Sequence, residues 1–198
     1  RSASRWGQDA KDPAGFVRTA LSLLATLRGS PCLYQGEELG LPEADVGFEQ
    51  LQDPFGIEFW PEFKGRDGCR TPMPWINEAM GGFTSGGHSW LPVEPIHRQL
   101  AVSEQTRVED STLNFTRRIF AWRKEHPALQ NGDFEWLDSH DDLLLFRRHN
   151  AQESIIVAVN MTANALPVSA QGQMISVPGF AQSDEQDVAA YSVAAWVQ

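Results

Sequence analysis

Apolar residues recur at helical spacing in the first part of the chain. Over residues 12–29 they fall on one face of a helix: Phe16, Ala20, Leu23, Leu24 and Leu27. Asp12 suits the N-cap position, Pro13 the first helical position and Gly29 the C-terminal end. We therefore predict a helix between Asp12 and Gly29.

A second helix is predicted at about residues 110–125. Its apolar side chains form two adjacent faces: Leu113 and Phe120, and Phe115, Ile119 and Trp122. A helix that is apolar on more than one face is covered on more than one side. The residue before a proline leaves the helical region, so the helix should end at His126, before Pro127.

From about residue 130 the apolar pattern alternates with a period of two. Five strands are predicted: 133–137, 142–149, 153–161, 173–177 and 188–197. In the third of them, one face carries Ile155, Val157, Val159 and Met161. Asn, Gly and Pro residues separate the strands. Short strands at this spacing indicate an antiparallel sheet or a small β-sandwich.

The segment after the first helix has a different character. Residues 32–34 (Cys-Leu-Tyr) follow a Ser-Pro break and are predicted to be a short buried strand. A helix that leads into a strand through a tight connection is typical of an alternating α/β architecture. We therefore predict two domains: residues 1–128, of the α/β class, and residues 129–198, which are all-β.

Residues 41 to about 110 show no sustained period and are punctuated by Gly and Pro throughout. Connections of this length are uncommon in compact domains and are usually functional or disordered. Disordered segments contain few aromatic residues, whereas this region is rich in Phe and Trp. We therefore predict a long ordered loop that packs on its own side chains.

Charge and composition narrow the possible partners. The net charge of −10 argues against nucleic acid, and no apolar run is long enough to span a membrane. Cys32 and Cys69 are too few for a disulfide scaffold. None of the five histidines lies at ligand spacing from another ligand residue: His88, His97, His126, His140 and His149. We expect neither a metal ion nor a cofactor.

Two adjacent glutamates are candidates for a site. Glu37 and Glu38 come directly after the predicted strand, and in a parallel barrel the ends of the strands carry the active site. The alternative is that both are solvated surface charges.

The stretch GRDGCRTPMPW, residues 65–75, holds the next candidates. An arginine in a rigid, proline-flanked loop can present a planar fork of donors to sugar hydroxyls or a carboxylate. The alternative is a salt bridge that staples the loop, from Arg66 to Asp67 or from Arg70 to a neighbour. The tryptophans of the region allow either a sugar-stacking surface or a small core of the loop: Trp60, Trp75 and Trp90.

Two of these motifs carry a family resemblance. LYQGEELGL (33–41) and GRDGCRTPMPW (65–75) resemble glycoside hydrolase family 13, the α-amylase superfamily, and most of all its exo-acting α-glucosidases and oligo-1,6-glucosidases. The resemblance extends over nearly the whole chain. It implies the last part of a TIM-type (β/α)8 barrel with a long ordered loop, followed by an antiparallel β-sandwich domain.

The resemblance also implies roles for single residues. Arg70 matches an arginine that binds hydroxyls of the non-reducing terminal sugar, and Glu38 a residue that contacts the sugar on the leaving side. Arg1 matches the arginine that closes an Asn-His-Asp-x-x-Arg motif, so we expect the chain to begin just after the Asn-His-Asp part. The carboxylates that cleave the bond in this family would then lie outside the chain, which would be inactive alone and would need the remainder of the polypeptide.

The function implied is that of a retaining α-glucosidase that removes terminal α-linked glucose from small oligosaccharides or glucosides, in the bacterial cytoplasm. One alternative is glucosyl transfer or sugar isomerisation, which would use the same covalent intermediate. The other is a non-catalytic β-sandwich module that packs or binds carbohydrate.

Overall fold

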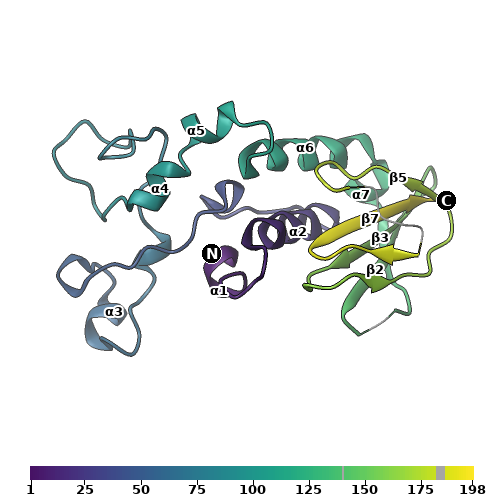
Figure 1. The fold of residues 1–198 in the computed structure, drawn as a ribbon, viewed down its shortest axis with the longest axis horizontal. Coiled ribbons are helices and arrows are strands. Elements are labelled where there is room, and N and C mark those ends of the chain that lie inside the picture. Colours follow the sequence, from purple (N-terminus) through teal and green to yellow (C-terminus); the bar gives the residue numbers. More distant parts are fainter. Residues whose placement is uncertain (140, 182–185) are drawn as a thin grey trace. The chain divides into compact units, whose positions relative to one another are not determined.

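The computed structural model describes residues 1–139, 141–181 and 186–198 (Figure 1). His140 lies outside the described residues. The chain forms two compact units, one of residues 1–5 and 34–113 and the other of residues 6–33 and 114–198. The domain boundary predicted at residue 128 stays a prediction, because the compact units describe how the chain packs and do not test that boundary.

Helix α2 (Pro13–Thr26) confirms the first predicted helix. The Asp12 side chain accepts a hydrogen bond from the Gly15 backbone amide, as an N-cap residue does. At the other end the C-cap is Leu27 rather than Gly29, although Gly29 has the left-handed φ of +111°. The predicted glycine therefore lies two residues beyond the C-cap residue, Leu27.

Helix α6 (Thr112–Glu125) confirms the second predicted helix and ends before His126. A further short helix, α7 (Pro127–Asn131), follows. Pro127 disfavours continuation of α6, but proline is well suited to the first position of a new helix. On α6 the ring of Phe115 is fully buried, and the ring of Phe180 meets it edge-on at 5.5 Å. A side chain at Gly179 would collide with the Phe115 ring, so that position requires glycine.

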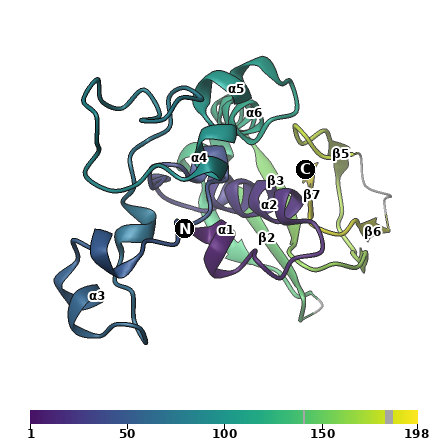
Figure 2. The ribbon, with the colours of Figure 1, turned by 60° about the vertical axis from the view of Figure 1, so that its left-hand side comes forward.

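The second unit contains a five-stranded antiparallel sheet in the order β1-β2-β3-β7-β5 (Figure 2). Its strands are β1 (Asp133–Trp136), β2 (Leu143–His149), β3 (Ser154–Asn160), β5 (Gln173–Ile175) and β7 (Ser192–Val197). A separate two-stranded ribbon pairs β4 (Leu166–Pro167) with β6 (Asp187–Val188). The predicted strands thus exist, but the pattern of residues 188–197 divides between β6 and β7.

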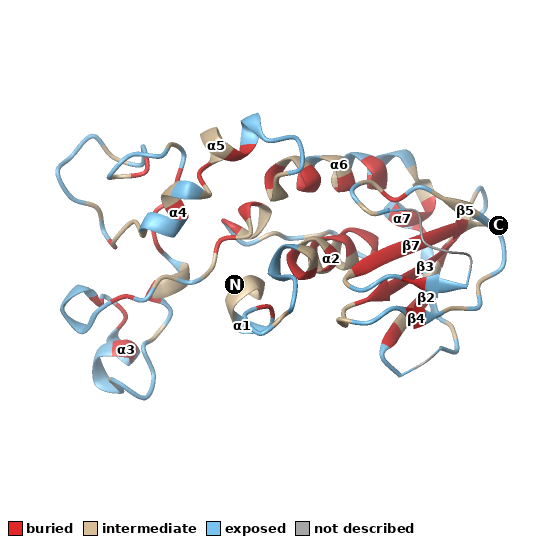
Figure 3. Ribbon diagram, in the orientation of Figure 1, coloured by how far each residue is buried: buried red, intermediate tan, exposed pale blue. Residues whose placement is uncertain are grey.

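Strand β3 is buried on both faces, because helices cover one side of the sheet and the ribbon covers part of the other (Figure 3). Ile155, Val157 and Val159 are fully buried, as predicted for one face. Ile156 and Ala158 point the other way and belong to a core cluster with Leu166 and Val188 of the ribbon. Alternation along β3 therefore separates two apolar faces instead of a core face and a solvent face.

Two buried arginines bind the C-terminal end of α2, one from the sheet and one from α6. Arg148 of β2 is fully buried and donates to the carbonyl oxygens of Thr26, Gly132 and Asp133 at 2.6–3.2 Å. Arg123 of α6 donates to the carbonyls of Ala25, Leu27 and Gly29. The last carbonyls of a helix have no partner within it, so these guanidinium groups satisfy the C-terminus of α2.

The first unit has little regular structure. Its helices are short: α1 (Ser2–Arg5), η1 (Glu37–Leu39), η2 (Phe48–Gln50), α3 (Pro54–Glu58), η3 (Asp67–Cys69), α4 (Pro95–Gln99) and α5 (Val102–Arg107). Its apolar clusters are mainly aliphatic, with Leu39, Leu41 and Leu113 in one and Val46, Leu51 and Leu91 in the other. The predicted long loop is therefore an ordered chain of turns around two small cores.

Two expectations for the first half of the chain are wrong. Residues 32–34 form no strand, because a strand needs a neighbour to pair with and no described segment supplies one. The segment is not buried either, since Tyr34 is 47% exposed. The aromatic residues of the long loop do not form its core. Most are exposed: Phe48, Phe55, Phe59, Phe63, Trp75, Phe83 and Trp90. Trp60 alone among the three tryptophans packs against an aliphatic cluster.

No helix among the described residues is long and apolar enough to cross a membrane.

Candidate functional site

The turn of residues 34–41 holds both predicted glutamates in place. Gly36 at its start has a φ of +88°, and a side chain there would collide with Leu41 and approach Nε of Arg1 at 3.0 Å. Glu38 accepts a hydrogen bond from the Gly36 amide at 2.8 Å. Glu37 accepts from the backbone amide and the hydroxyl of Ser2 at the start of α1. Both glutamates are half-buried and bonded to backbone, so they are not solvated charges.

Arg70 lies at the end of η3, in the stretch GRDGCRTPMPW. Its Nη1 is 3.3 Å from Oδ2 of Asp53 and 4.0 Å from Oδ1 of Asp67. The ion pair that staples this loop is thus made by Arg70 and Asp53, rather than by Arg66 and Asp67. The Arg70 side chain nevertheless stays 46% exposed. One nitrogen of the guanidinium is thus anchored, while nearly half of the side-chain surface stays open to solvent.

Two buried aspartates organise the backbone beneath Arg70. Asp67 is 1% exposed, and its Oδ2 accepts from the amides of Gln52 and Asp53 at 2.6 and 2.8 Å. Asp53 caps α3 through the Phe55 amide and accepts from the Arg66 amide at 2.9 Å. The Arg66 amide, followed by Phe55 and the guanidinium of Arg70, holds the pKa of Asp53 below its usual value, although burial opposes this.

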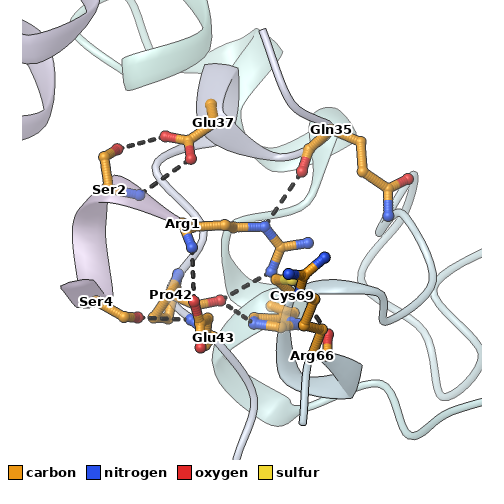
Figure 4. A network of polar contacts seen from close by, with 10 residues as sticks. Arg1, Ser2, Ser4, Gln35, Glu37, Pro42, Glu43, Arg66 and Cys69 are labelled. Atoms are coloured by element: carbon orange, nitrogen blue, oxygen red, sulfur yellow. Dashed lines mark hydrogen bonds and ion pairs between the residues drawn. The ribbon is translucent and has the colours of Figure 1, made fainter. Parts of the chain in front are cut away.

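Arg1 is 9% exposed and bonded to backbone (Figure 4). Its Nε donates to the carbonyl of Gln35 at 3.2 Å and its Nη1 to the carbonyl of Pro42 at 2.9 Å. These two contacts bracket the turn that carries Glu38. Burial lowers the pKa of Arg1, while Cys69, Tyr34, Glu37 and Glu43 act in the opposite direction.

Tyr34 links these residues electrostatically. Burial and the Cys69 thiol raise the pKa of its phenol, and the positive charges of Arg1 and Arg70 act against that rise. Tyr34, Cys69, Arg1 and Arg70 therefore share one neighbourhood of the first unit. The arrangement offers half-exposed guanidinium and phenol donors of the kind that bind hydroxyl groups.

Sequence reasoning missed two residues of this neighbourhood. Asp53 was not singled out, although an Asp directly before a proline is a recognisable N-cap signal. His97 was considered only as a metal ligand, yet its ring is fully buried between the turn of Pro42 and the Arg70 loop. No local pattern marks His97, because its partners are 26 and 55 residues away.

Trp75 and Trp90 remain candidates for contact with a ligand, since they are 49% and 65% exposed. Trp90 borders a hollow of about 410 Å³ that Gln50, Gln52 and His88 also line. No group of three or more His, Cys, Asp or Glu side chains among the described residues is placed to hold a metal ion.

Comparisons with known proteins agree with this picture. A probable alpha-glucosidase of Rhizobium meliloti (strain 1021) is 45% identical over 165 residues, which are 83% of this chain and 30% of the relative. An oligo-1,6-glucosidase of Heyndrickxia coagulans is 29% identical over 185 residues, or 84% of this chain and 33% of the relative. The chain thus spans about a third of the length of these relatives.

The solved structure of XgtA, described as an alpha-glucosyl transfer enzyme, superposes on the whole chain with a TM-score of 0.91 and 48% sequence identity, and 38% of that protein is covered. The model of the alpha-amylase catalytic domain matches residues 1–132, which include Arg1, Glu38 and Arg70. The chain therefore belongs to the α-amylase family.

Proposed function

We propose that the chain is the C-terminal part of a retaining α-glucosidase that removes terminal α-linked glucose from small oligosaccharides or glucosides, and that its own contribution is to bind the sugar. The observation that carries the proposal is Arg70: one nitrogen is held by Asp53 at 3.3 Å while the side chain stays 46% exposed. A charged donor that is both fixed in position and open to solvent is suited to hydroxyl recognition.

Glu38 and Arg1 contribute in different ways. Glu38 is fixed at the tight turn by the Gly36 amide, and we propose that it contacts the sugar on the leaving side of the bond. The hydrogen bonds of Arg1 go to the carbonyls of Gln35 and Pro42, so its part in binding is best explained through the position of this turn. Arg1 would thus act on the substrate indirectly.

The two catalytic carboxylates are proposed to come from the remainder of the polypeptide. A retaining glycosidase needs a nucleophile and a general acid/base on either side of the scissile bond. The carboxylates of Glu37 and Asp67 already accept hydrogen bonds from backbone amides of the first unit. The chain alone would therefore bind sugar weakly and hydrolyse nothing.

The β-strands are proposed to form a small sandwich whose role is packing. Leu166 and Val188 of the β4–β6 ribbon share a core cluster with Ala158 and Trp196 of the main sheet, which supports a second layer. The main exposed aromatic residue of the sheet is Trp136, on an edge strand. We expect residues 129–198 alone to show no binding of maltotriose by calorimetry.

Arg70→Ala in the complete enzyme tests the proposal. Loss of a fixed charged donor should lower kcat/KM for maltose or a nitrophenyl glucoside by at least about tenfold. Arg66→Ala is the matched control, because Arg66 is an exposed arginine of the same loop whose side chain contributes no ion pair to it. An unchanged kcat/KM in Arg70→Ala, or an equal loss in both variants, would overturn the assignment.

A second candidate function, glucosyl transfer, is favoured by the 48% identity to XgtA. Hydrolysis and transfer share a covalent glucosyl intermediate and differ in whether water or a sugar hydroxyl intercepts it. Product analysis of the complete enzyme on maltose separates the two. Hydrolysis yields glucose alone, whereas transfer yields new oligosaccharides whose fraction rises with the acceptor concentration.

A further inference from the structure

Five residues of the first unit form a closed ring of hydrogen bonds. Arg1 donates to the carbonyls of Gln35 and Pro42, and the Gln35 side-chain amide donates to the carbonyl of Thr71 at 3.2 Å. Nδ1 of His97 lies 3.4 Å from the Thr71 hydroxyl, and its Nε2 lies 2.9 Å from the Pro42 carbonyl. The ring therefore joins the turn around Glu38 to the residue that follows Arg70.

The partners of His97 determine its protonation. A carbonyl oxygen can only accept, so Nε2 must carry the proton that is donated to Pro42. Nδ1 of the neutral ring is then an acceptor, and the Thr71 hydroxyl donates to it. Burial lowers the pKa of His97, and the positive charge of Arg1 acts in the same direction while the Pro42 carbonyl opposes it. The lowered pKa favours the neutral imidazole, with Nε2 as the donor and Nδ1 as the acceptor.

Other contacts also hold the two loops: the Ala44 amide donates to the Gly68 carbonyl at 2.9 Å, and Asp53 anchors Arg70 at 3.3 Å. Neither residues 40–47 nor residues 70–94 contain a helix or a strand. Thr71, His97 and Leu41 are all fully buried, whereas Arg70 is half-exposed beside them. A buried polar network whose members are all satisfied rigidifies the segments that it joins.

We infer that His97 is a positioning residue for sugar recognition: through Thr71 and Pro42 it sets the placement of Arg70 relative to the turn that carries Glu38. The inference rests on the proposed function of Arg70. His97 contacts no reacting group in this account, so its effect should pass through Arg70. Displacement of a binding group by a fraction of an ångström to one ångström weakens binding substantially.

Three substitutions at His97 in the complete enzyme separate its two contacts. Gln can place an amide N–H near Nε2 and so keep the donor to Pro42, while Asn can place an oxygen near Nδ1 and keep the acceptor for Thr71. Because the Pro42 contact is the shorter one, His97→Gln should retain most of the activity, His97→Asn less, and His97→Ala least. Gln99→Ala, at an exposed residue of the same helix α4, is the control and should have no effect.

The expected signature is kinetic. KM should rise about tenfold in His97→Ala while kcat changes less than about threefold, because uniform binding is lost and the chemical step is untouched. In the double variant with Arg70→Ala, the His97 substitution should add little further loss, since coupled residues are not additive.

The possible outcomes distinguish the positioning role of His97 from the proposed function of Arg70. If Arg70→Ala lowers kcat/KM but His97→Ala has no effect or a fully additive one, the positioning role is wrong and the proposed function stands. If Arg70→Ala has no effect, the proposed function fails and takes this role with it. If His97→Ala does not fold, the activities of His97→Gln and His97→Asn decide. Higher activity in His97→Gln supports the inference, and wild-type activity in both variants overturns it.

Discussion

The two compact units hold their backbones by different means. In the unit of residues 6–33 and 114–198, backbone groups are paired within α2, α6 and the five-stranded sheet, and the buried side chains are largely apolar. The unit of residues 1–5 and 34–113, every residue of which the structure describes, has no strand, and the longest helix wholly inside it has six residues. There, single polar side chains bond to backbone groups of distant segments, a means that the other unit also uses at the C-terminus of α2.

The difference bears on where function can reside. An apolar sheet spreads its stability over many contacts, so few of its side chains individually determine the position of another residue. In the loop-rich unit, Asp53, Asp67 and His97 each form hydrogen bonds that connect two or more segments, and these bonds depend on direction. Such hydrogen bonds can place a side chain like Arg70 accurately without a surrounding sheet. Because they are few, substitution of any residue that forms one should disturb the local structure.

The strongest test of this contrast compares two aromatic residues. Phe115→Ala in the second unit should lower the free energy of unfolding by about 3–5 kcal/mol, because a fully buried ring packed against Phe180 is lost. Trp90→Ala in the first unit should change it by less than about 0.5 kcal/mol, because Trp90 is 65% exposed. Urea denaturation of the complete enzyme measures both, and similar losses would refute the claim that the aromatic rings of the first unit lie outside its core.

A second test asks whether buried charge matters in the apolar unit. Arg148→Met removes three hydrogen bonds to buried carbonyls and should cost about 2–3 kcal/mol. Burial, together with Arg123 and Arg28, lowers the pKa of Arg148 to about 10, so the residue stays charged at neutral pH. Arg147→Met on the same strand is the control, because Arg147 pairs with the exposed Glu135 and such pairs contribute about 0–1 kcal/mol. Equal effects would contradict the role of Arg148 as a cap for α2.

The smallest expected effect concerns acid. The pKa of Asp53 is depressed in the folded protein, so its contribution to stability is complete above the unfolded-state pKa and is lost as the pH falls through the folded-state value. Hydrogen exchange at the amides of Phe55 and Arg66 should therefore lose protection below about pH 4, the usual range of Asp, before the amides of β3 do. Asp53→Asn should show weak protection already at neutral pH and little further change with acid. Simultaneous loss in both units would contradict a local role.

Much of the fold was predictable because its signals are local. The cap at Asp12, the proline at residue 127 and the alternation of β3 each act within a few residues of themselves. Helix α2, the end of α6 and strand β3 are found where these signals predict them. The strand predicted at residues 32–34 does not form, because pairing depends on a neighbour that the segment itself cannot specify. The prediction that the aromatic residues of the long loop are buried was wrong for a related reason. The hydrophobic character of a side chain does not specify which part of the protein will cover that side chain.

By itself, the sequence determined the family, through the motifs at residues 33–41 and 65–75, together with the two long helices and the antiparallel strands. Only the tertiary structure decided which side chains share the neighbourhood of Arg70. Asp53, His97 and Arg1 reach it from 17, 27 and 69 residues away in the chain, counted from their positions. Hydrogen bonds over such separations depend on how the whole unit closes, and no local pattern of residues encodes that closure.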